Sequence, residues 1–114
     1  MGARVAWLAL LFVLAAAACG GSAPEVPVGP DGVADPVLLE GREVWASTCA
    51  RCHGGDGGGG RGPRLNGGRV VDAYPDVTDQ VVVVAEGLGQ MPSFADQLDA
   101  GEIEAVVRYT REVL

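Results

Sequence analysis

The stretch Cys49-Ala50-Arg51-Cys52-His53 decides how the rest of this 114-residue chain is interpreted. Two thiols three positions apart lie on one side of a helical turn and can reach the two vinyl groups along one edge of a porphyrin. The imidazole that follows can then point at the iron from one face. This C-x-x-C-H pattern is the attachment signal of c-type haem. It predicts one covalent haem, bound through Cys49 and Cys52 and ligated by His53.

Two other kinds of site share parts of this string. A structural zinc site normally takes four ligands, whereas the string offers two Cys and one His, and no second pair follows. A thioredoxin-type C-x-x-C pair belongs after a strand in an α/β fold, and the sequence predicts no such surroundings. Both remain alternatives to the haem interpretation.

The haem iron needs a second axial ligand, and the candidates are few. His53 is the only histidine, so two histidine ligands are excluded. Outside the first 18 residues the only methionine is Met91, which glycines precede and Pro92 follows. A lone methionine can also be ordinary core filling. Because the glycines give the chain freedom before Met91 and Pro92 fixes it afterwards, we expect Met91 to be the ligand. His/Met ligation would raise the reduction potential and close the iron to O₂.

Composition narrows the class of protein. Only 5% of the residues are aromatic, so the chain has little bulk for a core, and a bound porphyrin would supply apolar volume. The formal net charge is −7 and there is no lysine. Nucleic acid is therefore excluded as a partner, because binding phosphate needs the opposite charge.

The N-terminus resembles an export signal that ends at a lipidated cysteine. Residues 1–18 carry Arg4 and then an apolar run too short to span a membrane. Cys19 directly follows three alanines, much as in the lipobox of bacterial lipoproteins, although Ala16 replaces the usual leucine. Ordinary cleavage after Ala18 and an uncleaved anchor are the alternatives. We expect lipid on Cys19, because cleavage alone would leave a free thiol in an oxidising compartment.

Three helices are expected after a flexible tether. Residues 19–35, rich in Gly and Pro, predict the tether. A first helix should begin at the cap Asp35 and run to the cysteines. Residues 76–86 favour a helix capped by Thr78, although four consecutive valines have strand propensity. A last helix begins with a capping box formed by Asp99 and Glu102.

The region 36–114 resembles a class I cytochrome c of the small bacterial monohaem kind. The resemblance rests on the haem motif, a glycine-rich loop after it, Met91-Pro92-Ser93-Phe94, and a set of residues at fixed distances, which are Gly41, Trp45, Val106 and Tyr109. It implies an all-α fold of three to four helices around one haem, with the first and last helices crossing where Gly41 and Trp45 meet Val106 and Tyr109. It also implies that the carbonyl of Pro63 binds the imidazole of His53.

The resemblance implies a single-electron carrier and not an enzyme. The expected protein is an exported monomer, lipid-anchored on the outer face of the cytoplasmic membrane or in the periplasm, that serves redox partners of a respiratory chain. A fixed haem subunit of a larger oxidoreductase is the alternative, and a gas or redox sensor is a third. Arg61 and Arg64 are candidates for contacts to the haem propionates, since a guanidinium matches a carboxylate.

Overall fold

The computed structural model describes residues 21–114, and both the expected signal segment 1–18 and Cys19 lie outside this range. Its helical elements are α1 (Pro36–Val44), a π-helical turn (Trp45–Cys49), α2 (Ala50–His53), α3 (Arg69–Ala73), α4 (Val77–Glu86) and α5 (Ala100–Glu112). The first three run on without a break. Within the described range there are no strands, only two isolated β-bridges. The expectation of an all-α fold is confirmed.

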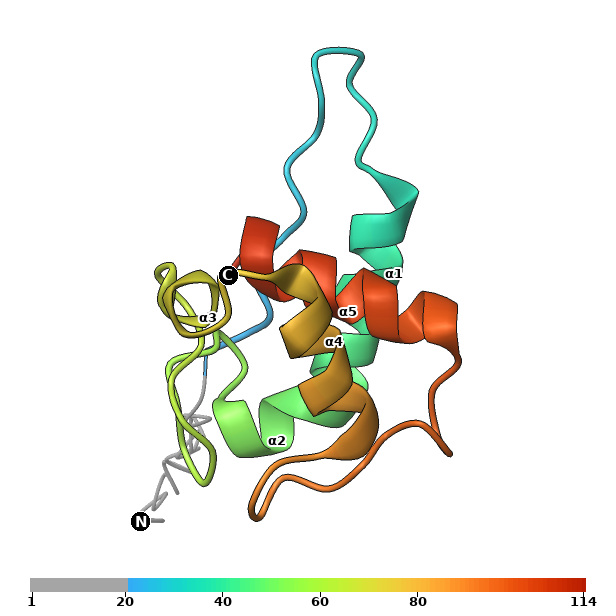
Figure 1. The fold of residues 1–114 in the computed structure, drawn as a ribbon. Helices are drawn as coiled ribbons and strands as arrows, with labels where there is room; N and C mark the ends of the chain where they lie inside the picture. Colours follow the sequence, from blue (N-terminus) through green and yellow to red (C-terminus); the bar gives the residue numbers. More distant parts are fainter. Residues whose placement is uncertain (1–20) are drawn as a thin grey trace, which may run out of the picture.

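Helices α1 and α5 cross closely (Figure 1). The point of closest approach on α1 is Gly41. A methyl group on Gly41 would overlap the backbone carbonyl of Ala105 and lie 2.8 Å from Cβ of Tyr109. Trp45 lies just after this crossing and packs on Tyr109, with 6.4 Å between the ring centroids. The backbone that meets Gly41 thus belongs to Ala105, while Val106 joins Trp45 in the core.

The helices begin where short polar side chains accept their first free N–H groups. Asp35 accepts from the N–H of Val37 at 2.8 Å, and Asp99 forms the expected capping box with Glu102. Helix α4 differs in one detail from the expectation. Its cap is Asp76, whose carboxylate accepts from the N–H of Thr78, two residues later, at 2.8 Å.

The glycine- and proline-rich segment before α1 is packed against the domain, contrary to its expected role as a flexible tether. We call residues 21–26 the strap. The carbonyl of Pro24 accepts hydrogen bonds from the hydroxyl of Tyr109 at 2.7 Å and from Nε of Arg42 at 3.0 Å, and Val26 is buried in the core. Sparse apolar periodicity excludes helices and strands here, but it does not prevent an irregular segment from binding to helices that are already formed.

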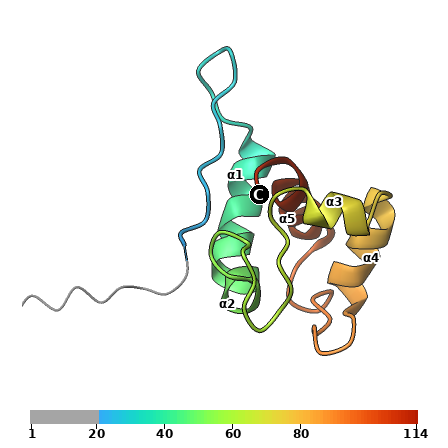
Figure 2. The same cartoon turned by 90° about the vertical axis from the view of Figure 1, so that its left-hand side faces the viewer.

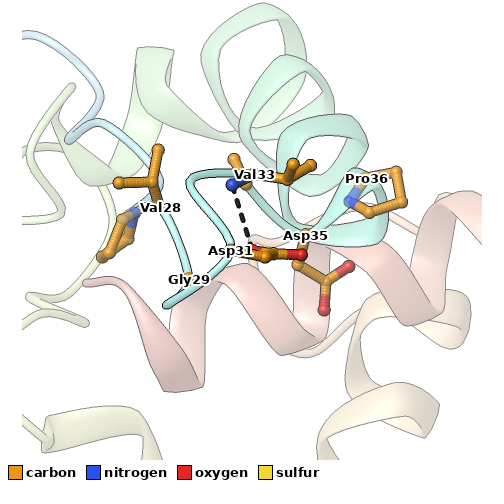
Figure 3. Close-up of a pocket in the computed structure, with 8 residues that line it drawn as sticks. Val28, Gly29, Asp31, Val33, Asp35 and Pro36 are labelled. Atoms are coloured by element: carbon orange, nitrogen blue, oxygen red, sulfur yellow. Dashed lines mark hydrogen bonds between the residues drawn. The ribbon is translucent and has the colours of Figure 1, made fainter.

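Residues 27–35 form a hairpin that stands away from the helices (Figure 1). Val28 and Ala34 form a β-bridge, and the N–H of Gly29 donates to the carbonyl of Val33 at 2.8 Å. At the tip the N–H of Val33 donates to the carboxylate of Asp31, as Figure 3 shows. The hairpin and Pro36 line a shallow hollow that shares no residue with the haem motif.

Candidate haem-binding site

A cavity of about 460 Å³ lies between α2, α4 and α5. Figure 2 shows α2 and α4 on opposite sides of α5. The cavity wall is mostly apolar and includes Trp45, Leu65, Val70, Val83, Val84, Phe94, Val106 and Val107. A hollow of this size and character is typical of a site for an apolar ligand with a few polar groups.

His53 projects into this cavity from the end of α2. Its side chain is only 7% exposed, and its Nδ1 lies 2.9 Å from the carbonyl oxygen of Pro63. A carbonyl only accepts, so Nδ1 carries the proton and Nε2 is the nitrogen left with a lone pair. This is the contact that the resemblance implied. Such a bond holds the ring in place and makes it a more basic ligand.

The glycine-rich loop brings Pro63 to this position by folding back over the motif. The N–H of Gly59 donates to the carbonyl of His53 and that of Gly62 donates to the carbonyl of Cys52, both at 2.7 Å. Gly59 adopts φ +100°, which favours glycine. Backbone hydrogen bonds to Cys52 and His53 therefore hold the loop against the haem motif.

Trp45 supports the imidazole from behind. The indole is 1% exposed, and its ring centroid lies 6.1 Å from that of His53. Its Nε1 donates to the carbonyl of Gly55 at 2.8 Å, so the buried polar atom has a partner. The indole thereby ties the helix before the haem motif to the loop after it.

The two cysteines of the motif are free thiols in the wall of the same cavity. Burial raises the pKa of the Cys49 thiol to about 11, although the nearby Arg51 acts in the opposite direction. Reactive cysteines of redox pairs have lowered pKa values. The environment of Cys49 therefore does not favour the thioredoxin-type alternative.

Met91 reaches the cavity from the loop after α4. Leu88 and Met91 exchange two backbone hydrogen bonds of 3.1 and 3.0 Å, which closes a tight turn. Gly87 is required before it, because φ is +82° and a Cβ there would lie 2.6 Å from the carbonyl oxygen of Met91. Ser93 then fastens the loop to α4 by donating to the carbonyl of Ala85 at 2.6 Å.

The two arginines proposed for the haem propionates separate in the structure. Arg61 lines the cavity. Arg64 does not; its Nε donates to the side-chain oxygen of Asn66 at 2.6 Å, on the exposed side of the loop. The turn of the loop thus directs two arginines three positions apart to different surroundings, and of the two candidates only Arg61 lines the cavity.

Sequence reasoning missed the polar part of the cavity wall. Gln80 is 4% exposed and lines the cavity, as does Thr110. A signal was present in the spacing, since Gln80, Val83 and Val84 recur at intervals of three and four residues on one face of α4. The four valines after Gln80 indicate apolar packing on this helix, and the sequence alone does not show that the amide lies on its buried face.

The residues present fit a c-type haem. Both thiols, the imidazole with its bound Nδ1, and the thioether of Met91 line one apolar cavity. Among residues 21–114, no three side chains of the types His, Cys, Asp and Glu are grouped to hold a metal ion directly. The zinc alternative finds no support in this part of the chain.

Comparisons with known proteins point to the same class. The family model for cytochrome c oxidase, cbb3-type, subunit III matches residues 36–109. Cytochrome c6 of Cladophora glomerata is 32% identical over 77 residues, which span 64% of this chain and 85% of that protein.

Solved structures share the arrangement of the helices. Cytochrome c6C from Synechococcus sp. PCC 7002 is 31% identical with a TM-score of 0.53, over 62% of this chain and 89% of that one. Cytochrome cL from Hyphomicrobium denitrificans has a TM-score of 0.56 over 66% of this chain. This chain spans only 46% of that cytochrome cL, and at 23% identity the likeness shows the fold alone.

Proposed function

The chain belongs to the cytochrome c family, and its cytochrome c6 homologues are electron carriers and not enzymes. We propose that it is a carrier whose haem iron is ligated by His and Met, tethered to a membrane and serving respiration. The single observation that carries the proposal is that one cavity is lined by Cys49, Cys52, His53 and Met91. The haem iron, once bound, supplies a reversible one-electron change between its ferric and ferrous states.

The residues of the chain hold and shield this group. Cys49 and Cys52 would hold the haem covalently through their thiols. His53, oriented by Pro63, and Met91 would be the ligands of the iron, and both would stay in place when an electron is gained or lost. The apolar walls exclude water, which favours the less charged, reduced state and raises the reduction potential together with the methionine sulfur. Arg61 is the remaining candidate for a propionate contact.

Absorption spectra of the holoprotein test the axial ligands. In Met91→Ala we expect the haem to stay covalently attached, while the weak long-wavelength band of sulfur-ligated ferric iron disappears and the reduced protein binds CO. In His53→Ala we expect no low-spin haem. Gln97→Ala is the control, since it alters an exposed side chain six residues after Met91 and outside the cavity wall, and it should leave the spectrum unchanged. An unaltered spectrum in Met91→Ala would exclude methionine as the ligand.

Membrane tethering is proposed from the sequence of the N-terminus. Lipid on Cys19, after removal of residues 1–18, would hold the domain on the outer face of the cytoplasmic membrane or in the periplasm. In the part of the chain that the structure describes, no helix is both long and apolar enough to cross a bilayer. We expect Cys19→Ser to move the haem protein from the membrane fraction to the soluble fraction. Retention of that variant in membranes would contradict lipid tethering.

A fixed subunit of a larger oxidoreductase is the second candidate function. The matching family model describes an oxidase subunit, and this observation favours a permanent partner. Purification under mild conditions distinguishes the two. A monodisperse monomer that is reduced and reoxidised by soluble partners supports the carrier, whereas stable co-purification with a catalytic subunit supports the alternative.

A further inference from the structure

A buried amide in the wall of the haem cavity leads to an arginine behind it. Nε2 of Gln80 donates to Oγ1 of Thr110 at 2.8 Å, and Oε1 of Gln80 accepts from Nη1 of Arg111 at 3.1 Å. Thr110 in turn donates to the carbonyl of Val107 at 2.8 Å. Gln80 and Thr110 line the cavity. Arg111 does not line it, but it contacts the side chain of Gln80, which does.

The guanidinium of Arg111 is held by neutral acceptors. Nη1 also donates to the carbonyl of Tyr74 at 2.8 Å, and Nη2 donates to that of Pro75 at 3.3 Å. The ion pairs found within residues 21–114 join Arg42 and Arg108 to carboxylates and do not involve Arg111. Its positive charge is therefore not neutralised by a carboxylate in this range, and its half-buried position weakens screening by salt.

Gln80 connects the charge of Arg111 to the cavity wall through its polarised amide group. Its carbonyl oxygen binds the cation, and this polarises the amide so that its N–H groups become stronger donors. One N–H is bound to Thr110, and the other has no acceptor among the hydrogen bonds of the described residues. Since the side chain is 4% exposed and lines the cavity, this second N–H belongs to the wall of the space that would hold the haem.

We propose that Arg111 and Gln80 are positioning residues that raise the reduction potential of the haem; this inference rests on the haem-carrying function proposed above. One electron from a protein donor converts ferric to ferrous iron, lowers the charge of the centre by one unit, and makes or breaks no bond. A fixed positive charge and an oriented donor nearby favour the state with the added electron, and their effect is larger where water is excluded.

Redox titration of the holoprotein tests the proposal. We expect Arg111→Gln and Gln80→Leu to lower the midpoint potential with a low-spin spectrum unchanged, and Arg111→Lys, which keeps the charge, to stay near wild type. Arg69→Gln is the matched control, because it removes an equal charge from an exposed site outside the cavity wall. The shift in Arg111→Gln should persist at high salt, whereas any shift in the control should fade.

Other outcomes would contradict either the inference about Arg111 and Gln80 or the proposed function. A midpoint potential in Arg111→Gln no lower than in Arg69→Gln would overturn the inference. If Arg111→Gln does not fold, Gln80→Leu decides alone, and an unchanged potential there overturns the inference as well. A wild-type protein without covalent haem, made in a host that attaches c-type haem, would instead overturn the proposed function.

Discussion

Gly62 stands beside the imidazole of His53 with no room for a side chain. A Cβ at this position would lie 2.8 Å from Cε1 and 2.9 Å from Nδ1 of the ring. The same short stretch supplies the Pro63 carbonyl that binds Nδ1. One residue thus sets how closely the loop approaches the axial ligand.

We expect Gly62→Ala to displace the imidazole or the loop. Overpacking of this kind costs about 1–3 kcal/mol, and disturbing the bond to Pro63 should also change the reduction potential. Thermal unfolding and redox titration of the holoprotein measure both effects. Gly101→Ala is the control, because its Cβ meets only the side-chain oxygen of Asp99 at 3.2 Å on an exposed helix start. Equal behaviour of the two variants would contradict the steric argument.

At the scale of elements, the crossing of α1 and α5 depends on backbone contact. Gly41 lets the carbonyl of Ala105 approach α1, and the residues that follow, Trp45 and Tyr109, are almost fully buried. Replacing the glycine must therefore separate the two helices. The resemblance already implied this crossing, since the glycine and the tryptophan keep fixed distances to the haem motif.

We expect Gly41→Ala to lower the free energy of unfolding by about 3 kcal/mol, the upper end of the usual range for overpacking. Alanine is the better helix former by about 1 kcal/mol, so a purely local effect would have the opposite sign. Chemical denaturation of the holoprotein gives the value. A stabilised Gly41→Ala variant would mean that the helices do not cross at this residue.

Asp35 joins the start of α1 to α5. Its carboxylate accepts from Nη2 of Arg108 at 3.0 Å, and this hydrogen bond, followed by that from Val37, lowers the pKa of Asp35. A lowered pKa in the folded state stabilises the fold above the unfolded value of about 3.9. That contribution is lost as the pH falls through the folded pKa.

We therefore expect Asp35→Asn, which keeps a good cap, to melt at a lower temperature than wild type at pH 7. The difference should shrink as the pH falls from about 4, the pKa of the unfolded state, toward the lower pKa of the folded state, where the native carboxylate is protonated. Thermal melts from pH 7 to pH 3 measure it, with the exposed Asp96→Asn as the control. A difference that does not vary with pH would exclude the ion pair as its source.

At the scale of the whole molecule, the strap joins the beginning of the described chain to its last helix. Pro24 and Tyr109 are 85 residues apart, and their hydrogen bond lies over the crossing of α1 and α5. Burial raises the pKa of the Tyr109 hydroxyl, so it remains a donor at neutral pH. At its first described residue the strap also touches the glycine-rich loop after the haem motif, where a Cβ on Gly21 would lie 3.0 Å from Asp56.

We expect Tyr109→Phe to loosen the strap without changing the haem spectrum. Loss of one hydrogen bond lowers the free energy of unfolding by about 1 kcal/mol, and amide exchange in residues 21–34 should accelerate most. Amides of α4 serve as the internal reference. Equal acceleration in both regions would mean that the bond stabilises the whole fold and does not hold the strap in particular.

Much of the site could be predicted because its signals are local. The haem motif places three groups within five residues, helix caps act over two or three positions, and Met91 is the only methionine outside the first 18 residues. The family resemblance added Pro63, whose contact to His53 spans ten residues. The sequence could not decide between Arg61 and Arg64 as the arginine beside the cavity, because the direction of each side chain depends on how the loop turns.

The sequence by itself determined the chemistry: the two thiols, the imidazole, the one thioether and the helices that present them, since these depend on neighbours along the chain. Only the tertiary structure decided that the strap binds Tyr109 and that Arg111 reaches the cavity through Gln80. Those contacts join residues 85 and 31 positions apart. They form only after the helices have packed, so no local pattern of residue types encodes them.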